Sequence, residues 1–249
     1  MTIEVVVYTI ESAMHAQKGG ADRIELCDNP GDGGTTPSFG TLEIVRQALS
    51  IDVYAMIRPR GGDFAYSAYE YHAMKRDIEM CKRASLDGVV LGILKPDGTI
   101  DKDRCRKLID AARPMKVTCH RAFDMTRDLK EALEDCIEVG FDCILTSGGQ
   151  ATAEQGVNVL AGLVMQANGR ITIMAGSGVN ESNVESIVRK TGVGAIHFSA
   201  KAYHDSMMQY RNAAIAGMGA SGGSEYQCRT VDEEVVKRMR QLAEQASRK

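Results

Sequence analysis

A short unit recurs four times along the chain, and it limits the available folds more than any other feature of the sequence. In each copy a small or turn-forming residue precedes a short apolar run rich in β-branched side chains, at 20–26, 85–91, 140–146 and 192–198. Glycine favours the left-handed conformation that ends a helix, and such a run suits a strand buried on both faces. Four further apolar runs lie between these units, at 3–7, 53–57, 116–119 and 171–175. We therefore expect eight strands.

The stretches that follow these runs have the periodicity of helices. Leu129, Leu133 and Cys136, for example, are spaced to line one helical face. Strict alternation of strand and helix requires parallel pairing with right-handed crossovers, which leaves an open doubly wound sheet or a closed barrel. An open nucleotide-binding sheet usually carries a Gly-x-Gly-x-x-Gly turn after its first strand, whereas residues 8–11 read Tyr-Thr-Ile-Glu. Eight units in 249 residues favour closure, so we predict an α/β chain folded as one (β/α)8 TIM-barrel domain over 1–249.

The C-terminal part of the chain departs from this repeat. Residues 217–224 consist mostly of glycine and other small residues, which predicts a flexible loop. The stretch 232–248 then places Val236, Met239 and Ala243 on a common face. We expect it to form an additional C-terminal helix that docks on the barrel or on a neighbouring subunit.

Charge and composition narrow the class of partner. The 33 acidic and 30 basic residues are mixed along the chain and leave a formal net charge of -3, without the basic excess that nucleic acid or an anionic membrane would favour. No apolar run approaches the roughly 20 residues of a membrane helix, and the first residues lack the pattern of a signal peptide. The seven cysteines contain no Cys-x-x-Cys pair, which fits reduced thiols. We expect a cytoplasmic protein whose partner is a small molecule, not nucleic acid or a membrane.

Polar side chains gather at the ends of the predicted strands, where a barrel of this kind carries its functional groups. The third, fifth and eighth strands run into Arg58, Arg60 and Asp63, into His120, Arg121 and Asp124, and through His197 to Ser199. Side chains alternate along a strand, so apolar Ile24 and Leu26 facing the helices place Glu25 inside the barrel. The same rule turns Glu4, Arg58, His120, His197 and Ser199 inward. Because buried charge is costly unless paired, these residues predict an ion network, a ligand pocket, or both.

Two inward residues suit proton transfer. His120 is the first candidate for general acid-base catalysis, because imidazole titrates near neutral pH and neighbouring arginines should lower its pKa. Glu25 is the second. A zinc hydrolase would usually show a His-x-His pair after the first strand, and a Schiff-base aldolase needs an inward lysine. The chain has neither at these places, so both classes are disfavoured.

A glycine-containing turn follows the seventh strand and offers a second kind of binding site. Gly176, Ser177 and Gly178 precede a predicted helix, so their backbone N–H groups could approach a phosphate or another anion at the helix N-terminus. The alternative is a tight turn that needs glycine only for steric reasons.

Five segments resemble the CutC family of copper homeostasis proteins. They are Glu-Leu-Cys at 25–27, Gly-Gly-Thr-Thr-Pro-Ser at 33–38, Ile-Arg-Pro-Arg-Gly-Gly-Asp-Phe at 57–64, His-Arg-Ala-Phe-Asp at 120–124 and Ile-Met-Ala-Gly at 173–176. The resemblance covers essentially the whole chain. It implies a cytoplasmic TIM barrel that forms a homo-oligomer, acts in copper homeostasis and, as described for some members, binds Cu(I) through cysteines.

The resemblance makes Cys27 the candidate metal ligand, although Val6, Val7 and Ser12 stand where some relatives carry cysteine. Cys119 could supply a second thiolate only if it faced inward, and strand alternation turns it outward. Three functions stay open: a copper-binding homeostasis protein, an enzyme acting on an anionic or phosphorylated small metabolite, and a non-catalytic sensor or scaffold using the same pocket. In the second, arginines 58, 60 and 121 would hold the anion and His120 or Glu25 would move a proton.

Overall fold

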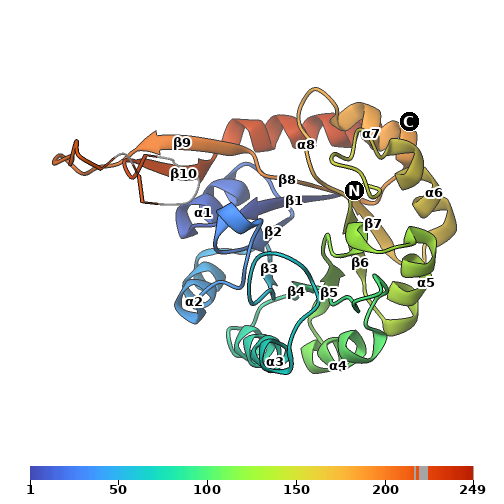
Figure 1. The fold of residues 1–249 in the computed structure, drawn as a ribbon. Coiled ribbons are helices and arrows are strands. Elements are labelled where there is room, and N and C mark those ends of the chain that lie inside the picture. Colours follow the sequence, from blue (N-terminus) through green and yellow to red (C-terminus); the bar gives the residue numbers. More distant parts are fainter. Residues whose placement is uncertain (216, 219–223, 249) are drawn as a thin grey trace.

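The computed structural model describes residues 1–215, 217–218 and 224–248, and eight parallel strands close into a barrel (Figure 1). The strands are β1 Thr2–Val7, β2 Arg23–Leu26, β3 Asp52–Met56, β4 Gly88–Leu91, β5 Lys116–Cys119, β6 Cys143–Thr146, β7 Thr172–Ala175 and β8 Ala195–Phe198. β1 closes the ring because it pairs with both β2 and β8, so that Glu4 lies opposite Arg23 on one side and His197 on the other. The predicted eight-stranded barrel is confirmed, and the open doubly wound sheet is excluded.

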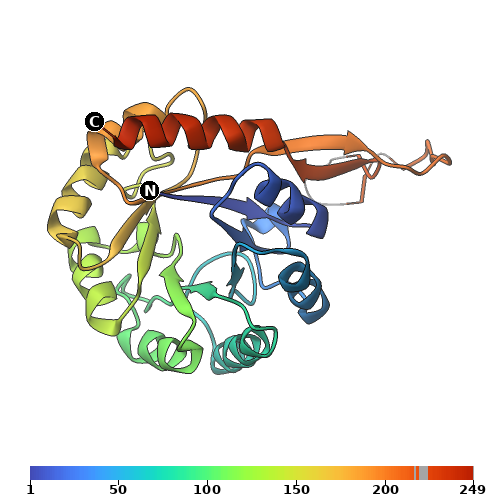
Figure 2. The same ribbon diagram turned by 180° about the vertical axis from the view of Figure 1, so that it is seen from behind.

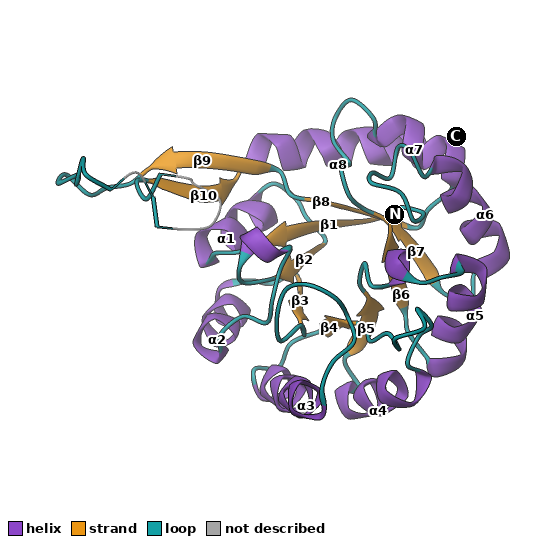
Figure 3. Cartoon of the chain, in the orientation of Figure 1, coloured by secondary structure: helices purple, strands orange, loops and turns teal. Residues whose placement is uncertain are grey.

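A ring of helices surrounds this barrel (Figure 3). They are α1 Ile10–Lys18, α2 Phe39–Ala48, α3 Ala68–Arg83, α4 Lys102–Ala112, α5 Leu129–Val139, α6 Val157–Ala167, α7 Val184–Thr191 and α8 Glu233–Ser247, with short 3-10 turns at Pro30–Asp32 and Phe123–Met125. Side chains such as Ile3, Val5 and Ile24 alternate with the inward ones and pack between strands and helices. In the described residues, no helix combines the length and apolar character needed to cross a membrane.

Large side chains fill the barrel at the amino ends of its strands, and a glycine leaves space for one of them. Tyr54 of β3 is buried, and a Cβ at Gly88 on the neighbouring strand β4 would lie 2.6 Å from its ring. Contacts below 3.0 Å force a shift, so any larger residue at position 88 would displace the tyrosine. The amino end of the barrel is therefore packed, and open space is left at the carboxyl ends of the strands.

The C-terminal segment forms an arm and then completes the helical ring. After β8, the chain leaves the barrel as an antiparallel pair, β9 Lys201–Asp205 and β10 Gln227–Val231, which projects sideways beyond α1 (Figures 1 and 2). The C-terminal helix predicted at 232–248 is α8, and it packs on the barrel beside α7 and α1. The sequence did not predict β9 and β10. The loop predicted at 217–224 falls largely outside the described residues, which include only 217, 218 and 224 of it.

Candidate functional site

A cavity of about 120 Å³ lies at the carboxyl ends of the strands. It is lined by Val6, Tyr8, Glu25, Gly33, Met56, Arg58, Phe64, His120, Arg121, Leu145 and His197. Five of these were predicted from the sequence: Glu25, Arg58, His120, Arg121 and His197. They come from strands far apart in the chain, which the closed ring brings to one rim.

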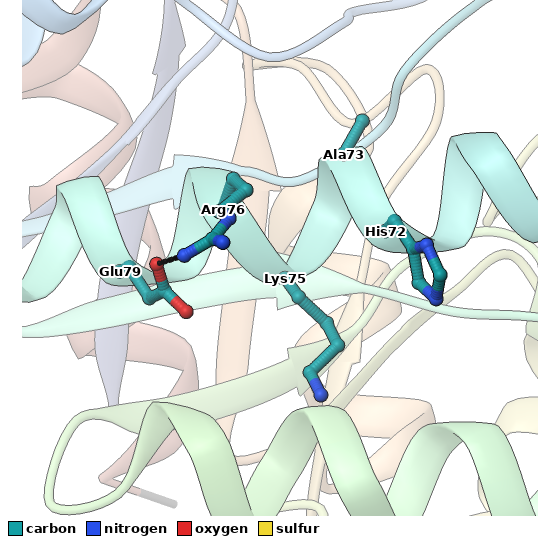
Figure 4. A pocket seen from close by; sticks show the side chains of 5 residues that line it. All are labelled: His72, Ala73, Lys75, Arg76 and Glu79. Atoms are coloured by element: carbon teal, nitrogen blue, oxygen red, sulfur yellow. Dashed lines mark hydrogen bonds and ion pairs between the residues drawn. The ribbon is translucent and has the colours of Figure 1, made fainter.

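A larger hollow, of about 480 Å³, lies elsewhere, on the outer surface of α3 (Figure 4). Its lining residues are all exposed and come from that one helix: His72, Ala73, Lys75, Arg76 and Glu79. Arg76 is already paired with Glu79 at 2.7 Å. We place the candidate site in the barrel cavity, because functional groups of this fold collect at strand ends.

Arg58 connects the cavity to the loops above it. Its Nη1 donates to the carbonyl oxygens of Asp32 and Gly34 at 2.6 and 3.0 Å, and its Nη2 donates to that of Gly62 at 2.8 Å. The guanidinium also lies 5.0 Å from the centre of the Phe64 ring. Its Nε is buried and has no partner among the described residues. Arg58 therefore fixes two loops and retains one N–H near the cavity.

His120 is held as a neutral imidazole. The backbone N–H of Ala122 donates to its Nδ1 at 3.2 Å, which leaves the ring proton on Nε2. Burial, together with the positive charge of Arg58, lowers the pKa of His120 to about 3. The ring packs against Phe64, with centroids 4.9 Å apart, and its Nε2 is buried without a partner in the described chain. His120 can thus donate a hydrogen bond at neutral pH but does not gain a proton there.

Glu25 and His197, which line the cavity, join Glu4 and Arg23 in a buried network. His197 Nδ1 lies 2.7 Å from Glu4 Oε1 and its Nε2 lies 3.9 Å from Glu25 Oε2, while Arg23 Nε donates to Glu4 Oε2 at 2.5 Å. Burial raises the pKa of Glu4, but Arg23 and His197 outweigh it and hold the value below normal. Burial lowers the pKa of His197, but Glu25 and Glu4 outweigh it and hold the value above normal.

Glu25 differs from the other members of this network because little compensates its burial. Desolvation raises its pKa to about 7, although the His197 charge works in the opposite direction. Its Oε1 is buried and has no partner in the described residues. Among the charged groups that line the cavity, Glu25 therefore changes protonation near neutral pH. These pKa values favour Glu25 over His120 for proton transfer, whereas the sequence led us to expect His120 first and Glu25 second.

Arg121 and Asp124 organise the next part of the rim. Asp124 accepts hydrogen bonds from the Thr146 hydroxyl and from the backbone N–H groups of Ser147 and Gly149, and it pairs with Arg121 Nε at 2.8 Å. The Arg121 side chain is 42% exposed and lines the cavity, whereas the Asp124 side chain is buried and does not line it. Asp124 therefore positions Arg121 and the loop after β6.

The remaining predicted ligand-binding residues lie outside the cavity lining. Arg60 pairs with Asp63 at 3.0 Å and with Glu70 at 2.6 Å, which braces the loop between β3 and α3. Ser199 follows β8 and is half-buried. The sequence placed three residues at strand ends that the structure does not bring into the cavity lining: Arg60, Asp63 and Ser199.

The turn at 176–178 also lies outside the lining. A Cβ at Gly176 would be 2.4 Å from Leu145 Cδ1 and 3.4 Å from His197 Cβ. Ser177 Oγ donates to the Ala151 carbonyl at 2.8 Å, and the carbonyl of Gly178 accepts from two asparagine side chains. These contacts favour the steric reason for glycine at position 176, which was the alternative to anion binding.

Sequence reasoning missed Tyr8, Phe64, Met56 and Gly33 as lining residues. Tyr8 could have been predicted from the sequence, because it continues the inward alternation of Glu4 and Val6 along β1. Phe64 and Gly33 lie in loops, and their approach to the cavity depends on Arg58 holding those loops. Tyr8 also links the cavity to the arm, because the guanidinium of Arg229 in β10 lies 4.3 Å from the centre of its ring.

Cys27 packs with Met56, whose thioether is a second soft donor, but the His, Cys, Asp and Glu groups of the described residues form no thiolate cluster there. Cys27 is buried, its thiol donates to Glu25 Oε2 at 3.5 Å, and burial together with the negative charge of Glu25 raises its pKa well above normal. Cys119 packs in the outer core, as predicted, and supplies no second thiolate. Among the His, Cys, Asp and Glu side chains of the described residues, the three whose ligand atoms lie within 4.8 Å of one another are Glu4, Glu25 and His197. These are mostly hard oxygen donors, whereas Cu(I) prefers thiolate and thioether.

The fold and the cavity together define a (β/α)8 barrel with a small polar chamber at the carboxyl ends of its strands. The model of the CutC family matches residues 1–202. The chain belongs to the CutC family.

Individual relatives agree with this assignment. A CutC family protein of Chromobacterium violaceum is 46% identical and covers 98% of both chains. The copper homeostasis protein cutC homolog of Homo sapiens is 46% identical over 97% of this chain and 88% of that protein. The crystal structure of the putative copper homeostasis protein CutC from Streptococcus agalactiae superposes with a TM-score of 0.77 at 34% identity, over 80% of this chain and 98% of that one.

Proposed function

We propose that this chain acts in copper homeostasis and that its barrel cavity binds a small anionic molecule. The first part is supported by the family and by the names of the human and mouse relatives. The observation that carries the second part is a set of three buried polar atoms on the lining residues, Glu25 Oε1, Arg58 Nε and His120 Nε2, which lack a partner among the described residues. An unsatisfied buried polar group costs about 1–3 kcal/mol, and a ligand in the cavity would supply the partners.

The size and charge of the cavity indicate the kind of ligand. Liquid water occupies about 30 Å³ per molecule, so the space corresponds to about four water molecules, or to one carboxylate or phosphate group. Two guanidinium groups line it, and their positive charge favours an anion, to which Arg58 could donate its remaining Nε–H. The rest of a larger ligand would extend past Arg121 toward solvent.

The same arrangement supports proton transfer on a bound metabolite, which makes an enzyme the second candidate function. Glu25, with a pKa of about 7, would exchange the proton. Neutral His120 would donate a hydrogen bond to an oxygen of the ligand through Nε2–H, and Arg58 and Arg121 would hold its negative charge. In the sensor alternative, the same contacts bind the ligand and no bond changes.

Thermal unfolding with added inorganic phosphate, acetate and sugar phosphates tests the pocket. A ligand at 100 times its dissociation constant adds about 2.7 kcal/mol, which for a chain of this size raises Tm by about 5–11 °C. Arg121→Met should abolish that rise, while Arg76→Met on the outer surface of α3 is the matched control and should keep it. No rise with any anion, or an equal rise in Arg121→Met, would contradict the pocket.

Two further expectations accompany the family role. We propose that the chain forms a homo-oligomer, which light scattering of the purified protein would detect. We also propose a cytoplasmic location, which fractionation of cells expressing a tagged chain would test.

A further inference from the structure

The arm presents a strand edge that has no partner in the described residues. β9 pairs with β10 along one edge, and its other edge pairs with no strand of the described chain. β10 is the strand that contacts α1, so the unpaired edge lies on the side of the arm away from that helix (Figure 1). A two-stranded hairpin by itself is only marginally stable in water, and an exposed edge is a template for pairing with another chain.

The register of the arm decides which backbone groups point to this free edge. Just beyond β9, the N–H of Ser206 donates to the carbonyl of Tyr226 at 2.8 Å, and this bond continues the ladder of β9 and β10. Bonded and non-bonded pairs alternate in an antiparallel ladder, so the even-numbered residues of β9 bond to β10. The N–H and C=O groups of Lys201, Tyr203 and Asp205 therefore point to the free edge.

This edge is complementary to itself. When a second copy of β9 pairs with it antiparallel about Tyr203, Lys201 lies opposite Asp205 of the second copy and Asp205 lies opposite its Lys201. These pairs, with Tyr203 opposite Tyr203, are the ones whose backbone groups point outward. One register thus forms both the hydrogen bonds and two ion pairs. The Asp205 carbonyl lies 3.0 Å from His204 Nδ1 and keeps a second lone pair for the new bond.

Other registers fit less well. A shift of two residues in either direction sets Tyr203 opposite Lys201 or Asp205 and loses both ion pairs. A shift of one residue sets outward groups opposite groups that already bond to β10. Because a two-fold contact uses the same patch on both copies, a charge pattern that matches only its own reverse indicates a second copy of this chain as the partner.

The same pairing brings the apolar surface of the arm against a second barrel. Nearly half of the large apolar side chains exposed in the described residues lie between positions 203 and 218, namely Tyr203, Met207, Met208, Tyr210, Ile215 and Met218. Exposed apolar side chains gathered in this way mark an interaction surface. In the antiparallel pair, the residues after Asp205 of the second copy continue past Lys201 of the first, toward its barrel.

We propose that two copies of this chain pair through the free edge of β9, so that their arms form one four-stranded antiparallel sheet with a two-fold axis at Tyr203. This interface rests on the homo-oligomer proposed above and locates its contact on the arm. It does not involve the barrel cavity, so anion binding and arm pairing stand or fall separately.

Charge reversal at the two ends of β9 tests the pairing, with the Kd of association measured by sedimentation equilibrium. Lys201→Asp sets two acids opposite each other at both ends, and Asp205→Lys sets two lysines there. Like charges opposite each other destabilise a strand pair, so each variant should raise the Kd by more than about tenfold. An equimolar mixture of the two variants restores opposite charges and should recover the wild-type Kd. Lys75→Asp on exposed α3 makes the same charge change and should not alter it.

A proline substitution tests the backbone bonds separately. The N–H of Tyr203 points away from β10, so Tyr203→Pro keeps the ladder within the arm but removes both hydrogen bonds at the two-fold axis. It should halve the sedimenting mass at concentrations where the wild type is assembled. Tyr203→Val, which keeps the N–H, should retain the assembled mass. Circular dichroism would verify that both variants fold.

Three outcomes would overturn the proposal. A wild type that is monomeric at every concentration would remove the homo-oligomer and this interface together. An assembled wild type whose mass is unchanged by both charge reversals and by Tyr203→Pro would keep the homo-oligomer and place its interface elsewhere. Weakened charge variants that do not recover on mixing would show that Lys201 and Asp205 do not face each other.

Discussion

The substitution Glu25→Gln tests the central electrostatic feature of the cavity. Glu25 is buried, its Oε1 has no partner in the part of the chain that the structure describes, and its pKa is raised from 4.5 to about 7. Such a change corresponds to about 3 kcal/mol, at about 1.4 kcal/mol for each pKa unit. This is the free energy that the fold loses when the carboxyl group ionises in place.

The direction of the pH effect on stability follows from the pH at which the folded and unfolded chains each release the Glu25 proton. The unfolded chain loses the Glu25 proton near pH 4.5, whereas the folded chain keeps it up to about pH 7. The free energy of unfolding therefore falls as the pH rises through this window and is constant above it. Glutamine cannot ionise, so the variant should match the wild type at pH 4 and exceed its stability by about 3 kcal/mol at pH 8.

Urea unfolding at a series of pH values, supported by Tm, measures the effect. A gain of about 3 kcal/mol should raise Tm at pH 8 by about 6–12 °C for a chain of this size. Glu43→Gln, at an exposed position of α2, is the control and should leave the pH dependence unchanged. If Glu25→Gln were less stable than the wild type at pH 8, attraction between ionised Glu25 and His197 would outweigh burial, and the reasoning would be wrong.

Two more substitutions test the packing around the site. Arg23→Met removes the guanidinium beside the fully buried Glu4 and should cost about 3–5 kcal/mol by urea unfolding at pH 7. Adding Glu4→Gln should restore part of that loss, and a further fall of similar size would show that the two residues do not depend on each other. Gly176→Ala forces a methyl group against Leu145 and should cost about 1–3 kcal/mol of unfolding free energy. Gly40→Ala on α2 has open space and should not destabilise; equal losses at the two positions would argue against a steric role for Gly176.

Much of the fold could be predicted because it rests on local patterns. The alternation of apolar and polar side chains along each strand placed Glu25, Arg58, His120 and His197 inside the barrel, and all four line the cavity. The arm could not be predicted in the same way. Its two strands are five residues each and lie more than 20 residues apart, so they do not belong to the helix-strand repeat from which the barrel strands were predicted.

The chemistry of the candidate site was harder to predict than its residues. The sequence assigned the same anion-binding role to arginines 58, 60 and 121. In the structure, Arg58 donates most of its N–H groups to loop carbonyls, and Arg60 pairs with Glu70 of α3. Arg121 lines the cavity on its open side. The pKa values favour Glu25 over His120 for proton transfer, opposite to the order expected from the sequence, because burial lowers the pKa of an imidazole and raises that of a carboxyl group.

The sequence by itself determined the eight-unit barrel, the inward direction of its polar side chains and the family resemblance, since periodicity and strand length are written in neighbouring residues. Only the tertiary structure decided which charges meet, because ring closure sets Glu4 between Arg23 and His197, residues that are 19 and 193 positions away. The pKa of a charged group depends on how much water burial removes from it and on its charged and hydrogen-bonding partners. Burial and partners are set only when distant segments pack together.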